Sequence, residues 1–384
     1  MSTAGIATPA QAAPPVRWRT RLSDLRVSPA QRAAALEVLD SGWLSMGPRT
    51  AAFERAFADA ANVDHAFAVA NGTAALLVAL KAVGVSPGDE VIVPSLTFVA
   101  DASVVRQLGA TPVLADITSV DRPLVDADDV LRAVTPRTRA VIVVHYAGVR
   151  MDVTPLLGRG FSVVEDAAHA IGPIADDGGW IPLLGDAAAY SFFANKNLPL
   201  GEGGMVTTRD HMLGERIRLL RSHAMTSGTW DRHRGHATDY DVVDVGVNAR
   251  LTEVQAAMGE VGLADLPVHN TVRRRLLRTY ADAFAGSGVR MALADEASTT
   301  GHIAVAVLPE PGSRPRIRAA LMDYRIQSSF HYPPIHAMTA YRDLPSRPLP
   351  HTKEAADRFV TLPLHPYLTD SEVHEVVSVV TAAL

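Results

Sequence analysis

The chain contains VVEDAAHAIG from Val163 to Gly172, and SFFANKNLPLGEGG from Ser191 to Gly204. The first stretch begins as an apolar run typical of a strand and reaches an acid at Asp166. The second stretch places Lys196 in a loop, between the apolar run that starts at Ser191 and a glycine-rich segment. An acid at a strand end, followed by a serine and a loop lysine, indicates an enzyme rather than only a globular protein.

The surrounding sequence alternates short apolar runs with helical segments. Runs expected to form strands lie at 66–70, 90–94, 111–117, 139–145, 161–166, 186–192 and 203–208. Strands that are apolar on both faces and alternate with helices indicate a mostly parallel sheet covered by helices on both sides. We therefore expect the α/β fold class.

Local signals also suggest how the chain is divided. Ser28-Pro29-Ala30-Gln31 combines a capping box with proline at the first helical position, which predicts a helix that stops at Gly42. The stretch 226–241 has no periodicity and is expected to be a long loop. We expect a flexible arm at 1–20, a large domain at 21–267 and a smaller α+β domain at 268–384.

Composition excludes several classes of protein. The 384 residues carry a net charge of −5, which gives no electrostatic case for nucleic acid or an anionic membrane as the main partner. The chain has 0 cysteines, so disulfides and thiolate metal sites are ruled out, and its histidines show no clear metal spacing. Neither a signal peptide nor an apolar run of the ~18 residues that span a bilayer is seen. We expect a cytoplasmic enzyme without a metal.

The polar residues fit the needs of pyridoxal phosphate (PLP). This cofactor requires a lysine for its Schiff base, a carboxylate for its pyridine nitrogen, donors for its phosphate and a flat group against its ring. Lys196 and Asp166 fit the first two needs, although Glu165 competes with Asp166, and strand alternation lets only one of the two acids face the site. Three further candidates each have a structural alternative. The segment Asn71-Gly72-Thr73-Ala74 either binds the phosphate or is an ordinary helix N-cap. Phe98 either packs on the ring or is a core residue, and His169 either caps a helix or contacts the phenolic oxygen.

Several ordered stretches resemble the DegT/DnrJ/StrS aminotransferases, which are fold-type-I PLP enzymes acting mostly on nucleotide-linked keto sugars. The resemblance extends from about Leu22 to the C-terminus. Its carriers are SGWLSMGPRTAAFERAFA, NGTAALLVALKAVGVSPGDEVIVPSLTFVA, GATPVLADI, VEDAAHAIG, SFFANKNLPLGEGGMVTT, GVNARLTEVQAAMG and SSFHYPPIH. It implies the large domain of that fold together with a smaller C-terminal α+β domain.

The resemblance also implies roles for individual residues. Lys196 is then the aldimine lysine, Asp166 pairs with the pyridine nitrogen, and His169 contacts the phenolic oxygen. The remaining implied cofactor contacts are Gly72, Thr73 and Ser191 at the phosphate, Phe98 on the ring, and Asn248, which reaches the phosphate from the partner subunit. A phosphate ligand from the partner implies a homodimer with shared active sites.

The substrate pocket is less well defined. The cluster Arg232-His233-Arg234-Gly235-His236 suits nucleotide-sugar phosphates or glutamate carboxylates, and a solvated surface loop is an equal alternative. Tyr332 is similar to a pocket residue of the family, with a packed structural role nearly as probable. The full set of substrate candidates is His223, Arg232, Arg234, His331, Tyr332 and His336.

Three positions depart from the family pattern. Val247 and Ala249 stand where an aromatic residue is often found beside the asparagine, and Ala224 stands where glycine is common. Because of these departures, the family is a weaker guide to the substrate of this protein than to its cofactor chemistry. Lys196 itself favours transamination over the family's dehydratases, in which histidine replaces this lysine.

The expected function is that of a PLP-dependent aminotransferase of amino-sugar biosynthesis in secondary metabolism. L-Glutamate or glutamine is the expected donor, pyridoxamine phosphate the carrier in a ping-pong mechanism, and a nucleoside-diphosphate-linked 4-keto-6-deoxyhexose the acceptor. The alternatives are a keto cyclitol or another small ketone as acceptor, and a PLP-binding relative that does not transaminate, such as a sensor.

Overall fold

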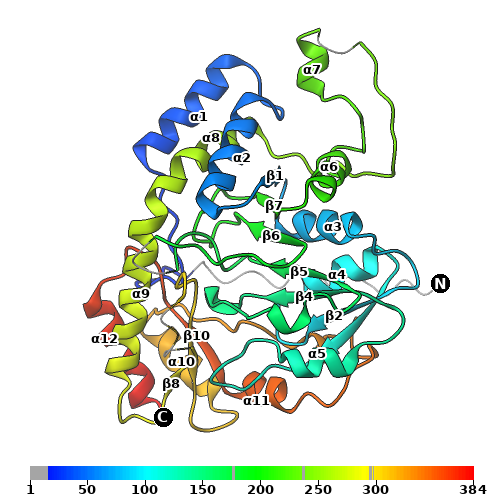
Figure 1. The fold of residues 1–384 in the computed structure, drawn as a ribbon. Helices are drawn as coiled ribbons and strands as arrows, with labels where there is room; N and C mark the ends of the chain where they lie inside the picture. Colours follow the sequence, from blue (N-terminus) through cyan, green and yellow to red (C-terminus); the bar gives the residue numbers. More distant parts are fainter. Residues whose placement is uncertain (1–15, 175–177, 236–237, 294–295, 297) are drawn as a thin grey trace, which may run out of the picture.

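A seven-stranded sheet forms the centre of the molecule (Figure 1). The computed structural model describes residues 16–174, 178–235, 238–293, 296 and 298–384. The sheet has the order β1-β7-β6-β5-β4-β2-β3, and β7 alone runs antiparallel to its neighbours. Its strands are β1 His65–Val69, β2 Glu90–Pro94, β3 Thr111–Ala115, β4 Thr138–Val144, β5 Ser162–Asp166, β6 Ala187–Ser191 and β7 Gly204–Thr208. The expected mostly parallel sheet is confirmed.

Helices cover both faces of this sheet, as the alternation of strand side chains requires. In β6, Ala187 and Ala189 join the core on one face, and Ala188 and Tyr190 join the core on the other. The first face is covered by α3 Gly72–Ala82, α4 Ala100–Gln107 and α6 His211–Leu220. The second is covered by α2 Pro48–Ala61 and α8 Glu253–Gly262, against which α1 Pro29–Ser41 packs.

Helix α1 follows its sequence signals closely. The Ser28 side chain accepts from the N–H of Gln31, the Gln31 side chain accepts from the N–H of Ser28, and Gly42 ends the helix with a φ of 73°. This positive φ is the conformation that glycine adopts without strain. Both predicted ends are confirmed because they depend only on neighbours in the sequence.

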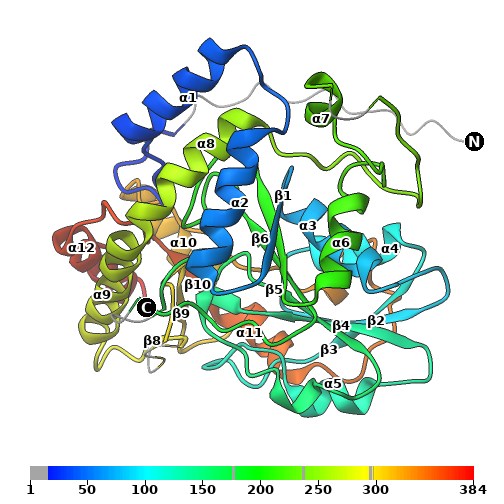
Figure 2. The same ribbon diagram turned by 45° about the horizontal axis from the view of Figure 1, so that its top comes forward.

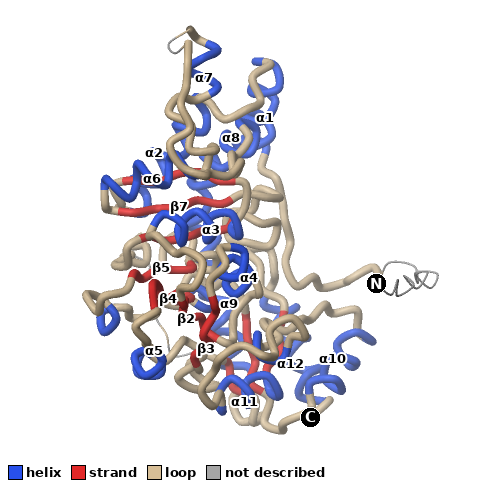
Figure 3. The backbone as a smooth tube through the Cα atoms, turned by 90° about the vertical axis from the view of Figure 1, so that its right-hand side faces the viewer, coloured by secondary structure: helices blue, strands red, loops and turns tan. Residues whose placement is uncertain are grey.

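The expected long loop at 226–241 instead contains a short helix, α7 Thr229–His233. Figure 3 shows α7 on a projecting segment, well away from the sheet. The Trp230 and His233 rings lie 4.7 Å and 4.6 Å from the Trp43 ring. Contacts between segments so distant in sequence explain why periodicity did not reveal this helix.

The C-terminal part adds a second, antiparallel sheet of order β10-β9-β8 (Figure 2). Val305 and Val307 of β9 join the core of the large sheet, whereas Ala304 and Ala306 face the core formed with α9 and α12. Its elements are α9 Leu266–Ala283, β8 Arg290–Met291, β9 Ala304–Val307, α10 Arg314–Asp323, α11 Pro350–Arg358, β10 Phe359–Leu362 and α12 Asp370–Ala382. The division at 267/268 remains a prediction.

Shorter elements complete the chain. They are α5 Ala127–Ala133 and the single turns η1 Tyr146–Gly148, η2 Thr154–Leu156, η3 Leu263–Asp265 and η4 Ile335–Ala337. Most of the arm expected at 1–20 lies outside the described residues, although Thr20 is buried and bridges to Ile326. Among the residues with described positions, no helix is both long and apolar enough to cross a membrane.

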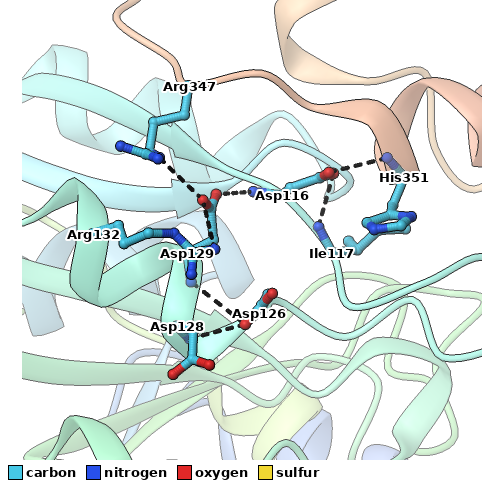
Figure 4. Close-up of polar contacts among 8 residues, drawn as sticks. All are labelled: Asp116, Ile117, Asp126, Asp128, Asp129, Arg132, Arg347 and His351. Atoms are coloured by element: carbon cyan, nitrogen blue, oxygen red, sulfur yellow. Dashed lines mark hydrogen bonds and ion pairs between the residues drawn. The ribbon is translucent and has the colours of Figure 1, made fainter.

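A buried carboxylate joins the large sheet to helix α11 (Figure 4). Asp116, which follows β3, accepts hydrogen bonds from the N–H groups of His351 and Thr352 at 3.0 Å and 2.8 Å, and from the Thr352 hydroxyl at 2.6 Å. Its own N–H donates to Asp129 in α5 at 2.9 Å. Asp116 thereby caps the start of α11 and fixes the C-terminal part against β3.

Replacing this carboxylate should destabilise the protein. Asp116→Ala leaves several buried donors without an acceptor, so we expect the free energy of unfolding to fall by about 3 kcal/mol. Urea unfolding measures the loss, and Asp343→Ala at an exposed position is the control. Equal stability of the two variants would contradict this role of Asp116.

Candidate active site

A pocket of about 400 Å³ lies beyond the C-terminal ends of the parallel strands. Residues from the first turn of α3, the ends of β4, β5 and β6, and the segment 331–332 line it. Nine sequence candidates meet there: Gly72, Thr73, Phe98, Asp166, His169, Ser191, Lys196, His331 and Tyr332. The fold thus brings together residues from five separate parts of the chain.

The end of β5 separates its two acids by strand alternation. Glu165 points away from the pocket and accepts from His145 Nε2 at 2.7 Å and from the N–H groups of Leu184 and Gly185 at 2.8 Å and 2.6 Å. Asp166 lines the pocket and accepts from the N–H of Ala168 at 2.9 Å. Asp166, rather than Glu165, is therefore available to a ligand.

Lys196 lies in a tight turn after β6. Its N–H donates to the carbonyl of Phe193 at 2.8 Å, and the next residue, Asn197, donates to Asn270 and to the Thr300 carbonyl at 2.9 Å and 3.1 Å. Burial lowers the pKa of the Lys196 amine to about 8, while the nearby carboxyls oppose the shift. A substantial fraction of this amine is neutral near pH 8 and can act as a nucleophile.

The first turn of α3 forms a cradle that suits a phosphate. A Cβ placed on Gly72 would lie 2.7 Å from the Cβ of Ser191, so glycine is needed for this close approach between α3 and β6. The first N–H groups of a helix have no partners within it and attract anions. With the Ser191 hydroxyl beside them, the N–H groups of Gly72 and Thr73 fit a phosphate.

Ala74 differs from Gly72 and Thr73, because its N–H already has a partner. Sequence reasoning placed it among the cofactor contacts, but its N–H donates to the Asn71 side chain at 2.8 Å. Ala74 is also missing from the described residues that line the pocket. The cap uses this N–H because an asparagine at the N-cap position bonds the third residue of the helix.

The hydrogen bonds of His169 fix the position of its ring proton. His169 Nδ1 accepts from the N–H of Ala147 at 3.2 Å, so the proton of the neutral ring lies on Nε2. His169 Nε2 lies 2.8 Å from the Tyr332 hydroxyl oxygen and donates to it. Burial holds the pKa of His169 well below its usual value, which keeps the ring neutral. The hydroxyl proton of Tyr332 is therefore free to point into the pocket.

Two other pocket residues surround Tyr332. The ring of Phe98 lies 5.7 Å from the Tyr332 ring and is 53% exposed, so it is accessible to a flat ligand. His331 Nδ1 lies 2.9 Å from the Thr361 hydroxyl, and burial lowers the pKa of His331 to about 4. Stacking of Phe98 on a cofactor ring stays a prediction.

Several sequence candidates lie outside this pocket. Arg232 donates to the Ser227 carbonyl at 2.7 Å, and its guanidinium lies over the Tyr240 ring at 4.8 Å. His336 Nδ1 lies 2.8 Å from the Ser95 hydroxyl. His236 falls outside the described residues, and the other candidates that do not line the pocket are His223, Arg234 and Asn248.

Sequence reasoning also missed some residues of the site. Thr97, Phe193, Asn195 and Glu202 line the pocket, and Asp101 is buried beside Asp166. Asp101 lies in the same stretch as Phe98, but a helical acid gives no local signal that it faces inward. Within the described parts of the chain, no group of three or more His, Asp or Glu residues could hold a metal ion.

Comparisons with known proteins agree with this site. Residues 27–381 match the model of the DegT/DnrJ/EryC1/StrS aminotransferase family. The chain is 37% identical over 360 residues to the spore coat polysaccharide biosynthesis protein SpsC of Bacillus subtilis (strain 168), covering 90% of this chain and 92% of SpsC.

Solved structures show the same fold. DesV of S. venezuelae, in complex with a ketimine intermediate, has a TM-score of 0.83 at 34% identity and covers 92% of this chain and 93% of its own. The PLP form of the sugar aminotransferase Spr1654 of Streptococcus pneumoniae has a TM-score of 0.86 at 27% identity, with coverage of 94% and 97%. The family, fold, enzyme class and cofactor expected from the sequence are confirmed: the chain belongs to the DegT/DnrJ/EryC1/StrS family of PLP-dependent aminotransferases.

Proposed function

We propose that this enzyme moves an amino group from L-glutamate or glutamine to a nucleoside-diphosphate-linked 4-keto-6-deoxyhexose. The donor would react and leave before the sugar enters, in a ping-pong sequence. The observation that carries the proposal is a Lys196 amine of lowered pKa in one pocket with the buried Asp166 and a phosphate cradle. The related DesI, 32% identical with a TM-score of 0.85, was crystallised in the presence of its TDP-sugar product, which supports a sugar acceptor.

Each pocket residue then has a distinct task. PLP, when bound, supplies the electron sink that lets an amino acid lose its α-proton. The Asp166 carboxylate would hold a proton on the pyridine nitrogen, and the Gly72 and Thr73 N–H groups would hold the phosphate with Ser191. The Lys196 amine would hold the cofactor and, when free, would take and return the substrate proton.

Tyr332 is suited to contact the acceptor. Because His169 donates to the Tyr332 oxygen, the tyrosine proton is left for a further acceptor in the pocket. A keto oxygen of the sugar is such an acceptor. We assign Tyr332 to orienting the sugar carbonyl, with His169 and the Ala147 N–H fixing its orientation.

We also propose a homodimer with shared active sites. The segment that follows α7 exposes apolar side chains, including Val243, Val245 and Tyr240, which are 55%, 77% and 51% exposed. Clustered exposed apolar residues are typical of an interface. Asn248 lies at the end of this segment, outside the pocket of its own subunit, as a residue donated to the partner's phosphate site would.

The first prediction from this proposed function concerns the two half-reactions. The protein with PLP should have a visible absorption band that disappears with L-glutamate and returns with the correct acceptor, because the amino group passes through the enzyme. Lys196→Ala should lack this band, and Lys353→Ala at an exposed position should retain it. Nucleoside-diphosphate keto sugars and keto cyclitols can be compared as acceptors. A band that ignores every amino donor would contradict transamination.

The second prediction concerns pH. Because the Lys196 amine has a pKa of about 8, lowered by burial, its neutral fraction grows as the pH rises toward that value. The rate at which the apoprotein attaches PLP should increase about tenfold from pH 6 to pH 7 and level off above about pH 8.5. Stopped-flow absorbance measures this rate, and a midpoint near the usual lysine value would disprove the assignment.

The third prediction tests the shared sites by mixing two inactive variants. In a dimer of one Lys196→Ala and one Asn248→Ala subunit, both substitutions fall in one site when Asn248 serves the partner, and the other site stays intact. Random mixing should then restore about a quarter of wild-type activity. If Asn248 serves its own subunit, mixing restores nothing.

A further inference from the structure

Asp101 is a buried acid that the roles assigned above do not use. It lies in the first turn of α4 and is 0% exposed. The Thr97 hydroxyl donates to Asp101 Oδ2 at 2.5 Å. The other oxygen, Oδ1, is buried, and no donor among the described residues reaches it. Oδ2 thus has a hydrogen-bond donor, whereas Oδ1 has none in the described structure.

A proton on Oδ1 removes this imbalance. An ionised carboxylate with an unpaired oxygen is costly in the protein interior, whereas a protonated one can donate. The proton belongs on Oδ1 because Oδ2 already accepts from Thr97. The Asp166 carboxyl is a hydrogen-bonding neighbour of Asp101. Burial, and then the charge of Asp166, raises the pKa of Asp101 well above its usual value.

The surroundings of Asp166 explain why the shared proton stays on Asp101. Burial raises the pKa of Asp166 as well, but the Ala168 N–H, the Lys196 and His145 charges and the Asp101 hydrogen bond all oppose that rise. Asp101 has only Thr97 and the charge of Lys196 to stabilise its ionised form. Two adjacent carboxyls that share one proton carry a single negative charge together.

We propose that Asp101 is a positioning residue for the cofactor, a neutral acid whose Oδ1–H donates to Asp166 and holds that carboxylate toward the pyridine nitrogen. The inference rests on the proposed role of Asp166 as the pyridine partner. A hydrogen bond from Asp101 would fix the rotation of the Asp166 carboxylate without adding a second negative charge. Asp101 would then affect the strength of cofactor binding while touching neither cofactor nor substrate.

Two substitutions separate this role from that of a charged acid. Asp101→Asn has the same shape, can donate to Asp166 through its NH₂ group and can still accept from Thr97. Asp101→Ala removes both hydrogen bonds. We expect the PLP dissociation constant of Asp101→Asn to stay within about threefold of wild type, and that of Asp101→Ala to rise roughly 10- to 100-fold, since a bond to a charged group is lost.

The measurements are a PLP titration followed by the visible band, the pH midpoint of that band, and thermal unfolding of each apoprotein. Asp101→Asn should also keep the wild-type pH midpoint, because it removes no charge. The infrared difference spectrum between wild-type and Asp101→Asn apoprotein at pH 7.5 should contain the carbonyl stretch of a protonated acid. This spectrum remains decisive if Asp101→Ala fails to fold.

Each other result overturns the proposal. A folded Asp101→Asn protein that binds PLP as weakly as Asp101→Ala would show that an ionised Asp101 is needed. Wild-type binding by Asp101→Ala would show that Asp101 positions nothing, and an ionised-carboxylate infrared signal would exclude the shared proton. If instead Asp166→Asn leaves PLP binding unchanged, the failure lies in the role proposed for Asp166.

Discussion

Burying two consecutive carboxylates at the end of β5 is the constraint on which the site depends. Glu165 is fully compensated by His145 and two backbone N–H groups, and these bonds hold its pKa below the usual value although burial opposes them. Within the described part of the chain, Asp166 receives one backbone N–H, from Ala168, and faces a pocket. Buried charges require partners, so the incomplete compensation of Asp166 favours a cationic ligand group. The fully bonded Glu165 is a structural residue that anchors the segment before β6.

The phosphate cradle and Lys196, the second half of the site, depend on close approach between the start of α3 and the strands β6 and β7. Strand β7 lies between β1 and β6, so the loop that contains Lys196 has to return beside the start of α3. A Cβ on Gly204 would lie 2.6 Å from the Asn71 carbonyl oxygen, just as one on Gly72 would meet Ser191. These two glycines let the first turn of α3 sit directly against the ends of β6 and β7. The phosphate cradle and the lysine are thereby positioned by the same packing.

The C-terminal part supplies polar groups as well as packing. Tyr332 reaches the pocket because the segment around it is tied down, with His331 bonded to Thr361 of β10 and Ser329 paired with the same strand. Asp116 fixes α11, which leads directly into β10. The tautomer of His169, and through it the direction of the Tyr332 hydroxyl proton, depends on the N–H of Ala147, a residue with a φ of 56°. The large sheet and the C-terminal part therefore build the pocket together.

Local patterns in the sequence were sufficient for the α/β class, the approximate positions of the strands, the cap of α1 and the pairing of Lys196 with an acid at the end of β5. Alternation and capping depend on residues that are close in the chain, so these features could be read without a structure. Strand alternation alone left Glu165 and Asp166 as competitors. The family resemblance implied Asp166, and the positions of His145 and the 184–185 backbone show that Glu165 is bonded away from the pocket. Nothing in the sequence pointed to α7 or to Asp101 beside Asp166. It also could not show that Arg232, Arg234 and His336 lie outside the pocket of their own subunit. Each of these depends on how elements distant in sequence pack, which only the tertiary structure determines.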